Sequence, residues 1–394
     1  MRTTRTLSMI LAAIIVWSCD LIDPSRPDSS IPETFPLESS ALNGTMGKAQ
    51  LEAVCPSSVK DLLTNDIELY KIIYRTTYQK DTLKSEALVA VPAGMDEVKL
   101  CAYFHGAVLP ISFIPMNNFS GYKGGPTISK DIASCILPLA SHGYCVVVPE
   151  YIGYGITSKK DHPFIYYPEL NIDCLDAIRA ARKFLDTNDI HYSNDIRLTG
   201  WSEGAGEALY AHRDMEQNHP DEFNVIATSS LAGPYSIYHM MMNIFAHPDK
   251  EYGSLMLYSW AGYALNKFAP TLNRPSTELF TSATNTQSSA LRHITGTPAS
   301  TFNQDFMTGI LEGTDTEFIK VMEECSTYEG WTPKGYVFLH HGTADSTVPC
   351  FNSEDAYESF NDTGKAKIYL YKFGEHDTSL NKYISTTIED FESL

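Results

Sequence analysis

Short apolar runs alternate with segments of helical periodicity along most of the chain. The runs have the length of buried strands, and most of them are bounded by Gly, Pro, Asp or His. They cover residues 100–104, 144–149, 196–199, 225–231, 336–339 and 368–371. Helical spacing of apolar positions is found in residues 128–140, 170–185 and 204–215. Strands that alternate with helices pair in parallel, so the pattern predicts the α/β class, with a mostly parallel sheet covered by helices on both faces.

A hairpin is predicted ahead of this alternation. Residues 67–79 and 83–92 alternate apolar and polar positions around the turn-like Lys80-Asp81. This pattern is typical of two antiparallel strands. In the parallel part that follows, functional groups are expected at the carboxyl ends of the strands.

One long segment interrupts the alternation between the fourth and fifth parallel strands that we expect. Residues 235–330 are rich in tyrosine and methionine and are mostly helical in pattern. We interpret them as an inserted helical cap. The cap divides the predicted core into residues 45–234 and 331–394.

The first residues have the pattern of an export signal. Arg2 and Arg5 precede an apolar run over residues 7–17, which is too short to span a bilayer. Residues 16–19, Val-Trp-Ser-Cys, resemble the bacterial lipobox, in which the cysteine is acylated and becomes the mature N-terminus. We therefore expect residues 1–18 to be a lipoprotein signal peptide, with plain secretion as the alternative.

A flexible tether is predicted between the lipidated Cys19 and the fold. Residues 20–40 are rich in Pro, Ser and Asp and have few large apolar side chains. We assign residues 19–44 to the tether, with the domain beginning near Thr45. The protein is then expected outside the cytoplasm, held at the cell envelope or cell surface, with the lipid as its contact with the membrane.

Charge and cysteine content narrow the possible partners. The formal net charge is −19, which repels phosphate backbones, so nucleic acid is not an expected partner. The cysteines have no CxxC or Cys/His spacing of the zinc type, so neither a metal nor another cofactor is expected. An odd number of cysteines follows Cys19, and no particular disulfide is predicted.

The most informative motif lies in residues 196–206, Ile-Arg-Leu-Thr-Gly-Trp-Ser-Glu-Gly-Ala-Gly. A strand runs into G-x-S-x-G and then into a helix. A nucleophile on a tight strand-to-helix turn needs neighbours without side chains, and Gly200 and Gly204 meet that need. The context predicts that Ser202 is a nucleophile.

A serine nucleophile needs a base, and the base needs an acid that orients it. Asp345 follows the predicted strand at 336–339, and His376 follows the next one at 368–371. The order Ser, Asp, His and these positions after strands fit a catalytic triad.

Other side chains near these two were weighed for the same roles. His340 and His341 end the strand before Asp345, which suits shaping that loop better than acting as the base. Glu375 and Asp377 adjoin His376 in the sequence, so their side chains are expected to point elsewhere.

Acyl transfer also needs N–H donors for the oxyanion. The backbone N–H of Glu203, directly after the nucleophile, is one candidate, and its side chain has the charge favoured at a helix N-terminus. A strand that ends in His105-Gly106 supplies the second donor, for which Ala107 is the first choice. Gly106 and Val108 are the alternatives.

Together these motifs resemble the α/β-hydrolase superfamily over roughly residues 65–394. Residues 149–155, Pro-Glu-Tyr-Ile-Gly-Tyr-Gly, and 232–235, Ala-Gly-Pro-Tyr, resemble segments of secretory lipases and related secreted esterases. Those relatives usually have Asp where this chain has Glu150, and they carry a helical lid before the acid loop. The resemblance implies hydrolysis of carboxylic esters, with lipids as the expected substrates, whereas the spacing of the residues implies only acyl transfer.

Three functions remain open at this stage. The leading hypothesis is an extracytoplasmic serine esterase or lipase, whose cap residues 254–265 either line an acyl channel or only hold the cap in place. A serine aminopeptidase would need an acidic pair for the substrate ammonium, to which Glu203 or Glu150 could belong. A lipoprotein that binds ligands with a vestigial hydrolase fold is the third, and an intact triad argues against it.

Overall fold

The computed structural model describes residues 37–109 and 118–394 of the chain. The predicted signal peptide, the lipidation site at Cys19 and most of the predicted tether lie outside the described residues. Within the described ranges, no helix is both long and apolar enough to cross a membrane.

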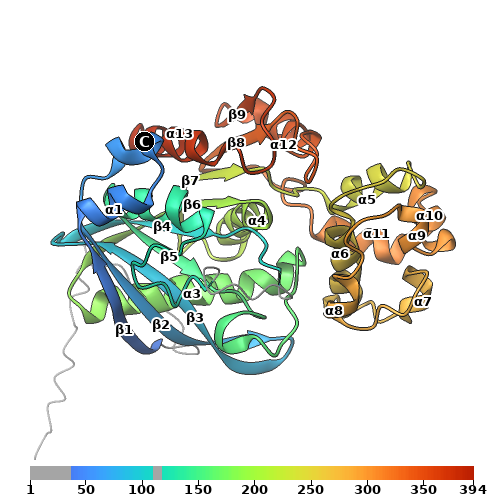
Figure 1. Cartoon of the computed structure of the whole chain (residues 1–394), viewed down its shortest axis with the longest axis horizontal. Coiled ribbons are helices and arrows are strands. Elements are labelled where there is room, and N and C mark those ends of the chain that lie inside the picture. Colours follow the sequence, from blue (N-terminus) through green and yellow to red (C-terminus); the bar gives the residue numbers. More distant parts are fainter. Residues whose placement is uncertain (1–36, 110–117) are drawn as a thin grey trace, which may run out of the picture. The chain divides into compact units, whose positions relative to one another are not determined.

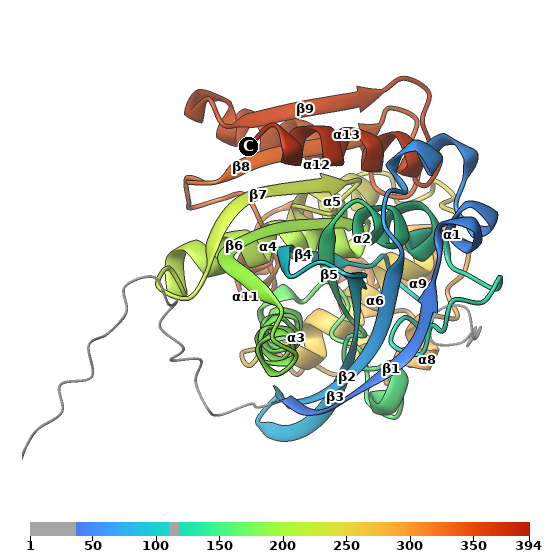
Figure 2. The ribbon, with the colours of Figure 1, turned by 90° about the vertical axis from the view of Figure 1, so that its left-hand side faces the viewer.

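The core contains a nine-stranded sheet in the order β1-β2-β3-β5-β4-β6-β7-β8-β9 (Figure 1). Figure 2 shows this order from β1 to β3 at the bottom to β9 at the top. The strands are β1 (Leu37–Met46), β2 (Ile67–Tyr78), β3 (Asp81–Pro92), β4 (Glu97–Phe104), β5 (Tyr144–Pro149), β6 (His191–Trp201), β7 (Asn224–Leu231), β8 (Tyr336–Gly342) and β9 (Ala366–Tyr371). The strands from β4 to β9 pair in parallel, whereas β1 to β3 are antiparallel. The mostly parallel sheet and the predicted hairpin are both present.

Strand β1 corrects the predicted start of the domain. Residues 37–44 were assigned to the tether, but they belong to a strand that pairs with β2 at the edge of the sheet. Most of the strand is exposed. An edge strand is hydrogen-bonded along one side and need not bury apolar side chains, so its polar composition resembles that of a linker.

Helices cover both faces of the sheet. The helices α3 (Tyr167–Thr187), α4 (Glu203–Asn218) and α12 (Phe351–Phe360) pack on one face. The other face is covered by α1 (Lys48–Val54), α2 (Leu137–Ser141) and α13 (Leu380–Glu392). Along β4, Leu100 and Ala102 face the first layer and Cys101 and Tyr103 the second, and all four are buried. A strand buried on both sides reads as a continuous apolar run, which is why the sequence pattern located it.

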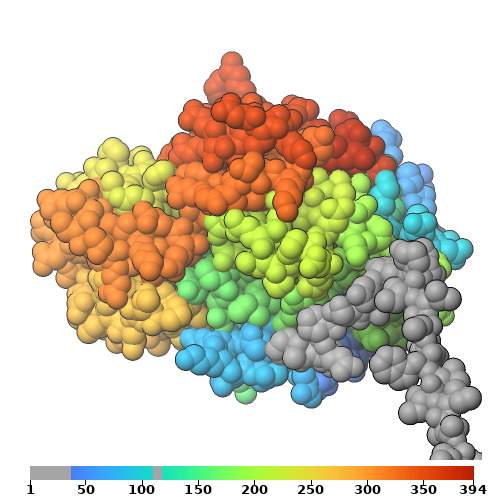
Figure 3. Space-filling model, turned by 180° about the vertical axis from the view of Figure 1, so that it is seen from behind, coloured from blue at the N-terminus to red at the C-terminus, as the bar shows by residue number. Residues whose placement is uncertain are grey.

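The segment between β7 and β8 forms the short helices that gather in one lobe, yellow to orange in Figure 3. They are α5 (Ile237–Phe245), α6 (Leu255–Phe268), α7 (Ser276–Leu279), α8 (Gln287–Ala290), α9 (Pro298–Thr301), α10 (Gln304–Leu311) and α11 (Thr316–Glu324). We call residues 235–330 the cap. The seven cysteines from Cys55 to Cys350 are free thiols.

Candidate active site

The predicted nucleophile Ser202 lies on a strained turn between β6 and α4. Its backbone φ is 59° and its ψ is −125°, a conformation that is costly for a residue with a side chain. A Cβ atom at Gly204 would lie 2.0 Å from the carbonyl oxygen of Phe104, and one at Gly200 would lie 2.2 Å from that of Gly204. The two glycines are therefore required for the close packing of α4 against β4 and β6.

The structure brings Ser202, His376 and Asp345 together, although they are far apart in the sequence. The Nδ1 atom of His376 lies 2.7 Å from Oδ2 of Asp345, and its Nε2 atom lies 2.9 Å from Oγ of Ser202. The carboxylate accepts from Nδ1–H, so Nε2 is left to accept the proton of the serine hydroxyl. All three side chains follow strands of the sheet, at the carboxyl ends of β6, β8 and β9.

Asp345 is held by its own loop as well as by His376. Its Oδ1 atom accepts hydrogen bonds from the backbone N–H groups of Thr347 and Val348, at 2.8 and 2.9 Å. Burial raises the pKa of this carboxyl, but hydrogen bonds from His341 and His376 outweigh burial and hold the pKa well below its usual range. Asp345 is therefore ionised wherever the protein is folded near neutral pH.

The two histidines at the end of β8 contact groups other than Ser202. Nδ1 and Nε2 of His341 lie 2.7 Å from the Ser353 hydroxyl and 2.9 Å from the Val348 carbonyl oxygen, so this side chain supports the loop of Asp345. His340 is buried against the Tyr371 hydroxyl, and burial lowers its pKa to about 3.

Contacts that the sequence did not predict hold the loop of His376. The indole N–H of Trp201 donates to the His376 carbonyl oxygen at 2.9 Å, and Asp377 pairs with Lys130. Asp377 thus faces a lysine rather than the imidazole of His376. These partners lie more than 170 residues apart in the sequence, and local pattern gives no signal for them.

The loop after β4 has an unpredicted support as well. Oδ1 of Asp131 accepts from the N–H of Gly106 at 3.2 Å and from the Tyr103 hydroxyl at 2.7 Å. The N–H of Gly106 is therefore engaged. Among the described hydrogen bonds, none involves the N–H of Ala107 or of Glu203 as donor, which leaves the two preferred oxyanion donors available.

His105 fixes the same loop from within. Its imidazole is stacked between Phe119 and Tyr151, with ring centroids 4.2 and 4.0 Å away. Its Nδ1–H donates to the Gly106 carbonyl oxygen at 2.8 Å. Burial lowers the pKa of His105 to about 3, so the ring is neutral, and it stabilises the loop by packing.

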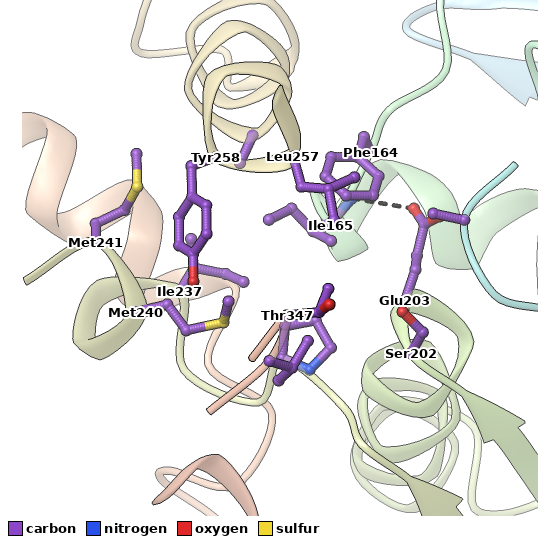
Figure 4. A pocket seen from close by; sticks show the side chains of 14 residues that line it. Phe164, Ile165, Ser202, Glu203, Ile237, Met240, Met241, Leu257, Tyr258 and Thr347 are labelled. Carbon is purple, nitrogen blue, oxygen red and sulfur yellow. Dashed lines mark hydrogen bonds between the residues drawn. The ribbon is translucent and has the colours of Figure 1, made fainter. Parts of the chain in front are cut away.

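An apolar cavity adjoins Ser202 (Figure 4). The core contributes Ala107, Phe164, Ile165, Ser202, Glu203, Pro234, Thr347 and Val348, and the cap contributes Ile237, Met240, Met241, Leu257, Tyr258 and Ala261. Glu203 is the single carboxyl side chain of this lining. The cavity thus lies between core and cap, with Ser202 in its wall.

No group of three or more His, Cys, Asp and Glu side chains in residues 37–109 and 118–394 could hold a metal ion.

The sequence of the chain matches a known protein family. A sequence model of the secretory lipase family matches residues 126–383, more than half of the chain. A comparison with curated protein sequences finds no match.

Solved structures share the fold at low sequence identity. The rice cell wall degrading esterase LipA from Xanthomonas oryzae matches with a TM-score of 0.73 and 19% identity, over 91% of this chain and 98% of the esterase. Candida antarctica lipase A in its closed state matches with a TM-score of 0.61 and 17% identity, over 91% of this chain and 82% of the lipase. Both likenesses concern the α/β-hydrolase fold. The family match over residues 126–383 leads to the conclusion that the chain belongs to the secretory lipase family and is a carboxylic ester hydrolase.

Proposed function

We propose that the protein is an extracytoplasmic serine hydrolase that cleaves carboxylic esters through an acyl-enzyme on Ser202. The observation that carries this proposal is the hydrogen-bonded chain from Ser202 through His376 to Asp345, beside an apolar cavity. The three groups are spaced as an activated serine requires.

The reaction follows from the positions of these atoms. As Oγ of Ser202 attacks the ester carbonyl, its proton passes to Nε2 of His376, and the negative charge of Asp345 stabilises the imidazolium that forms. The N–H groups of Ala107 and Glu203 stabilise the oxyanion. His376 then protonates the leaving alkoxide. In the second half it takes a proton from the water that attacks the acyl-enzyme, and it returns this proton to Oγ of Ser202 as the bond to the acyl group breaks. The products are an alcohol and a carboxylic acid.

The acyl part of the substrate is proposed to occupy the cavity under the cap. Met240 and Met241 are flexible apolar side chains, and with Leu257 they suit contact with an alkyl chain. Lipids and esterified polymers outside the cell are the substrates that this chemistry fits. Export by the predicted signal at residues 1–18, with Cys19 acylated, would place the enzyme there.

An aminopeptidase is the less favoured alternative because its acidic pair is incomplete. Glu203 lines the cavity, but Oε2 of Glu150 accepts a hydrogen bond from the Ser120 N–H at 2.5 Å, and Glu150 is not part of the lining. A single carboxylate that already pairs with a histidine is a weak site for a substrate ammonium.

The test is a panel of p-nitrophenyl esters of increasing chain length, assayed beside aminoacyl-p-nitroanilides. We expect turnover of the esters, with kcat/KM rising from acetyl toward octanoyl. Turnover of the anilides alone would overturn the proposal in favour of a peptidase. Turnover of neither class, together with no reaction with a fluorophosphonate probe, would favour a binding protein with an inactive hydrolase fold.

A further inference from the structure

The side chain of Glu203 is buried in the cavity wall, next to the turn that carries Ser202. It is 1% exposed, and its Oε1 atom lies 2.8 Å from Nε2 of His162 and 3.2 Å from the donating N–H of Ile165. Figure 4 shows Glu203 beside Ser202, with a dashed line marking its bond to Ile165. The triad chemistry uses only the backbone N–H of this residue, so the carboxylate has no role in that scheme.

The partner of this carboxylate is a buried histidine with a defined proton. His162 is 0% exposed, and its Nδ1 atom lies 2.7 Å from the carbonyl oxygen of Ile152. A carbonyl oxygen can only accept, so Nδ1 carries a hydrogen. Oε1 of Glu203 faces Nε2 of this ring, so the two side chains form a buried hydrogen-bonded pair. The hydrogen bond between the two side chains requires a fixed geometry. Removing one of them leaves the other buried without its hydrogen-bond partner, which is unfavourable.

The same loop holds a strained residue. Ile165 has a φ of +50°, a left-handed conformation that is rare and strained for a β-branched side chain. Its N–H is bonded to Glu203, and its side chain lines the cavity together with that of Phe164. The carboxylate therefore helps to hold the conformation that places these two apolar side chains in the wall.

The loop also contacts the cap. The N–H of His162 donates to Oε1 of Gln287 at 2.7 Å, and the indole N–H of Trp260 donates to the same oxygen at 3.3 Å. Phe164 stacks on Trp260 with ring centroids 4.1 Å apart and an interplanar angle of 7°. A continuous set of contacts thus runs from the turn of the nucleophile to helices α6 and α8 of the cap.

We propose that the Glu203 carboxylate is a positioning residue for acyl-chain specificity. By binding His162 and Ile165 it fixes the loop at residues 162–165, which forms part of the cavity wall and joins that wall to the cap. This inference rests on the proposed function, because it assumes that the acyl chain occupies the cavity. A long chain reaches Phe164 and Ile165, whereas an acetyl group does not.

The test compares two identical changes on one helix. Glu207 lies one turn after Glu203 in α4 and is 0% exposed, and none of its described hydrogen bonds reaches the loop at 162–165. Glu203→Gln and Glu207→Gln therefore remove the same buried acid at nearly the same volume. The readout is the ratio of kcat/KM for p-nitrophenyl octanoate to that for acetate, which cancels changes common to both substrates.

We expect Glu203→Gln to lower this ratio about tenfold, the effect of losing contact with about two methylene groups. Most of that loss should lie in KM for octanoate. Glu207→Gln should leave the ratio within about twofold of the wild type. His162→Ala should lower the ratio as much as Glu203→Gln, and the double variant should add little, since both changes release the same loop.

The outcomes distinguish a failure of the proposed function from a failure of the positioning role of Glu203. Wild-type protein that hydrolyses no ester would overturn the proposed function itself. Wild-type protein with an octanoate preference that Glu203→Gln retains would overturn the positioning role and leave the proposed function intact. Equal losses in Glu203→Gln and Glu207→Gln would also overturn it, because the effect would then come from any buried acid on α4.

Discussion

The indole N–H of Trp201 donates to the carbonyl oxygen of His376 at 2.9 Å, so the residue before the proposed nucleophile holds the loop of the proposed base. The rings of the two residues also pack together, with centroids 5.4 Å apart. One side chain thus aligns the serine and histidine positions, which come from different strands.

Trp201→Phe should lower kcat by about tenfold with little change in KM. Phenylalanine keeps the ring packing but lacks the donor, so His376 is held less firmly relative to Ser202. Steady-state kinetics with a short ester measures the effect, and thermal unfolding checks that the fold is retained. A variant with the wild-type kcat would show that the hydrogen bond does not align the base.

Asp131 should affect kcat because it supports the loop after β4, which is proposed to bind the oxyanion. Asp131→Ala removes the acceptor of the Gly106 N–H and should lower kcat by about 10² to 10³, the range seen when an oxyanion donor is lost. Asp131→Asn keeps an oxygen acceptor, and burial already raises the pKa of Asp131, so this variant should retain most activity. Equal kcat values for the two variants would contradict the role.

Glu150 should make the fold less stable as the pH rises. Burial, and secondarily the charge of Glu86, raises the pKa of Glu150 to about 8 in the folded protein, whereas an unfolded glutamate ionises near about 4.3. Between these values the folded state binds a proton that the unfolded state has lost, so the free energy of unfolding falls with increasing pH.

Glu150→Gln removes this titration and keeps an acceptor for the Ser120 N–H. Between pH 5.5 and pH 8.5 its Tm should therefore fall less than that of the wild type. The measurement is thermal unfolding at the two pH values. Parallel shifts in the two proteins would mean that Glu150 is already ionised when folded.

Narrowing the cavity should reduce activity on long chains selectively. Ala261 lines the cavity from α6, whereas Ala264 on the same helix is also buried but is not part of the lining. Ala261→Leu should lower kcat/KM for octanoate more than for acetate, and Ala264→Leu should affect both esters alike. If both variants changed the ratio of octanoate to acetate activity equally, the acyl chain would not occupy this cavity.

The features that were predictable from the sequence are those encoded locally. The turn around Ser202 follows from Gly200 and Gly204, and the loops of Asp345 and His376 follow from the apolar strands directly before them. Strand β1 was missed because most of its residues are exposed and have no alternating pattern.

Long-range partners could not be predicted in this way. Asp131 begins a helical segment and reads as an ordinary acidic residue near a helix start, and only the fold brings it to Gly106. His162 and Glu203 are 41 residues apart and occupy an irregular loop and a helix start. Such pairs depend on the crossing of elements, which hydrophobic periodicity does not specify.

The most direct test of the account is labelling with a fluorophosphonate probe, followed by intact mass and peptide mapping. The wild type should gain one probe equivalent at Ser202, His376→Ala should react far more slowly, and Ser202→Ala should not react. Ester turnover should fall by about 10⁴-fold or more in Ser202→Ala. Near-wild-type turnover of Ser202→Ala, or a probe adduct mapped to another residue, would contradict the assignment of Ser202 as the nucleophile.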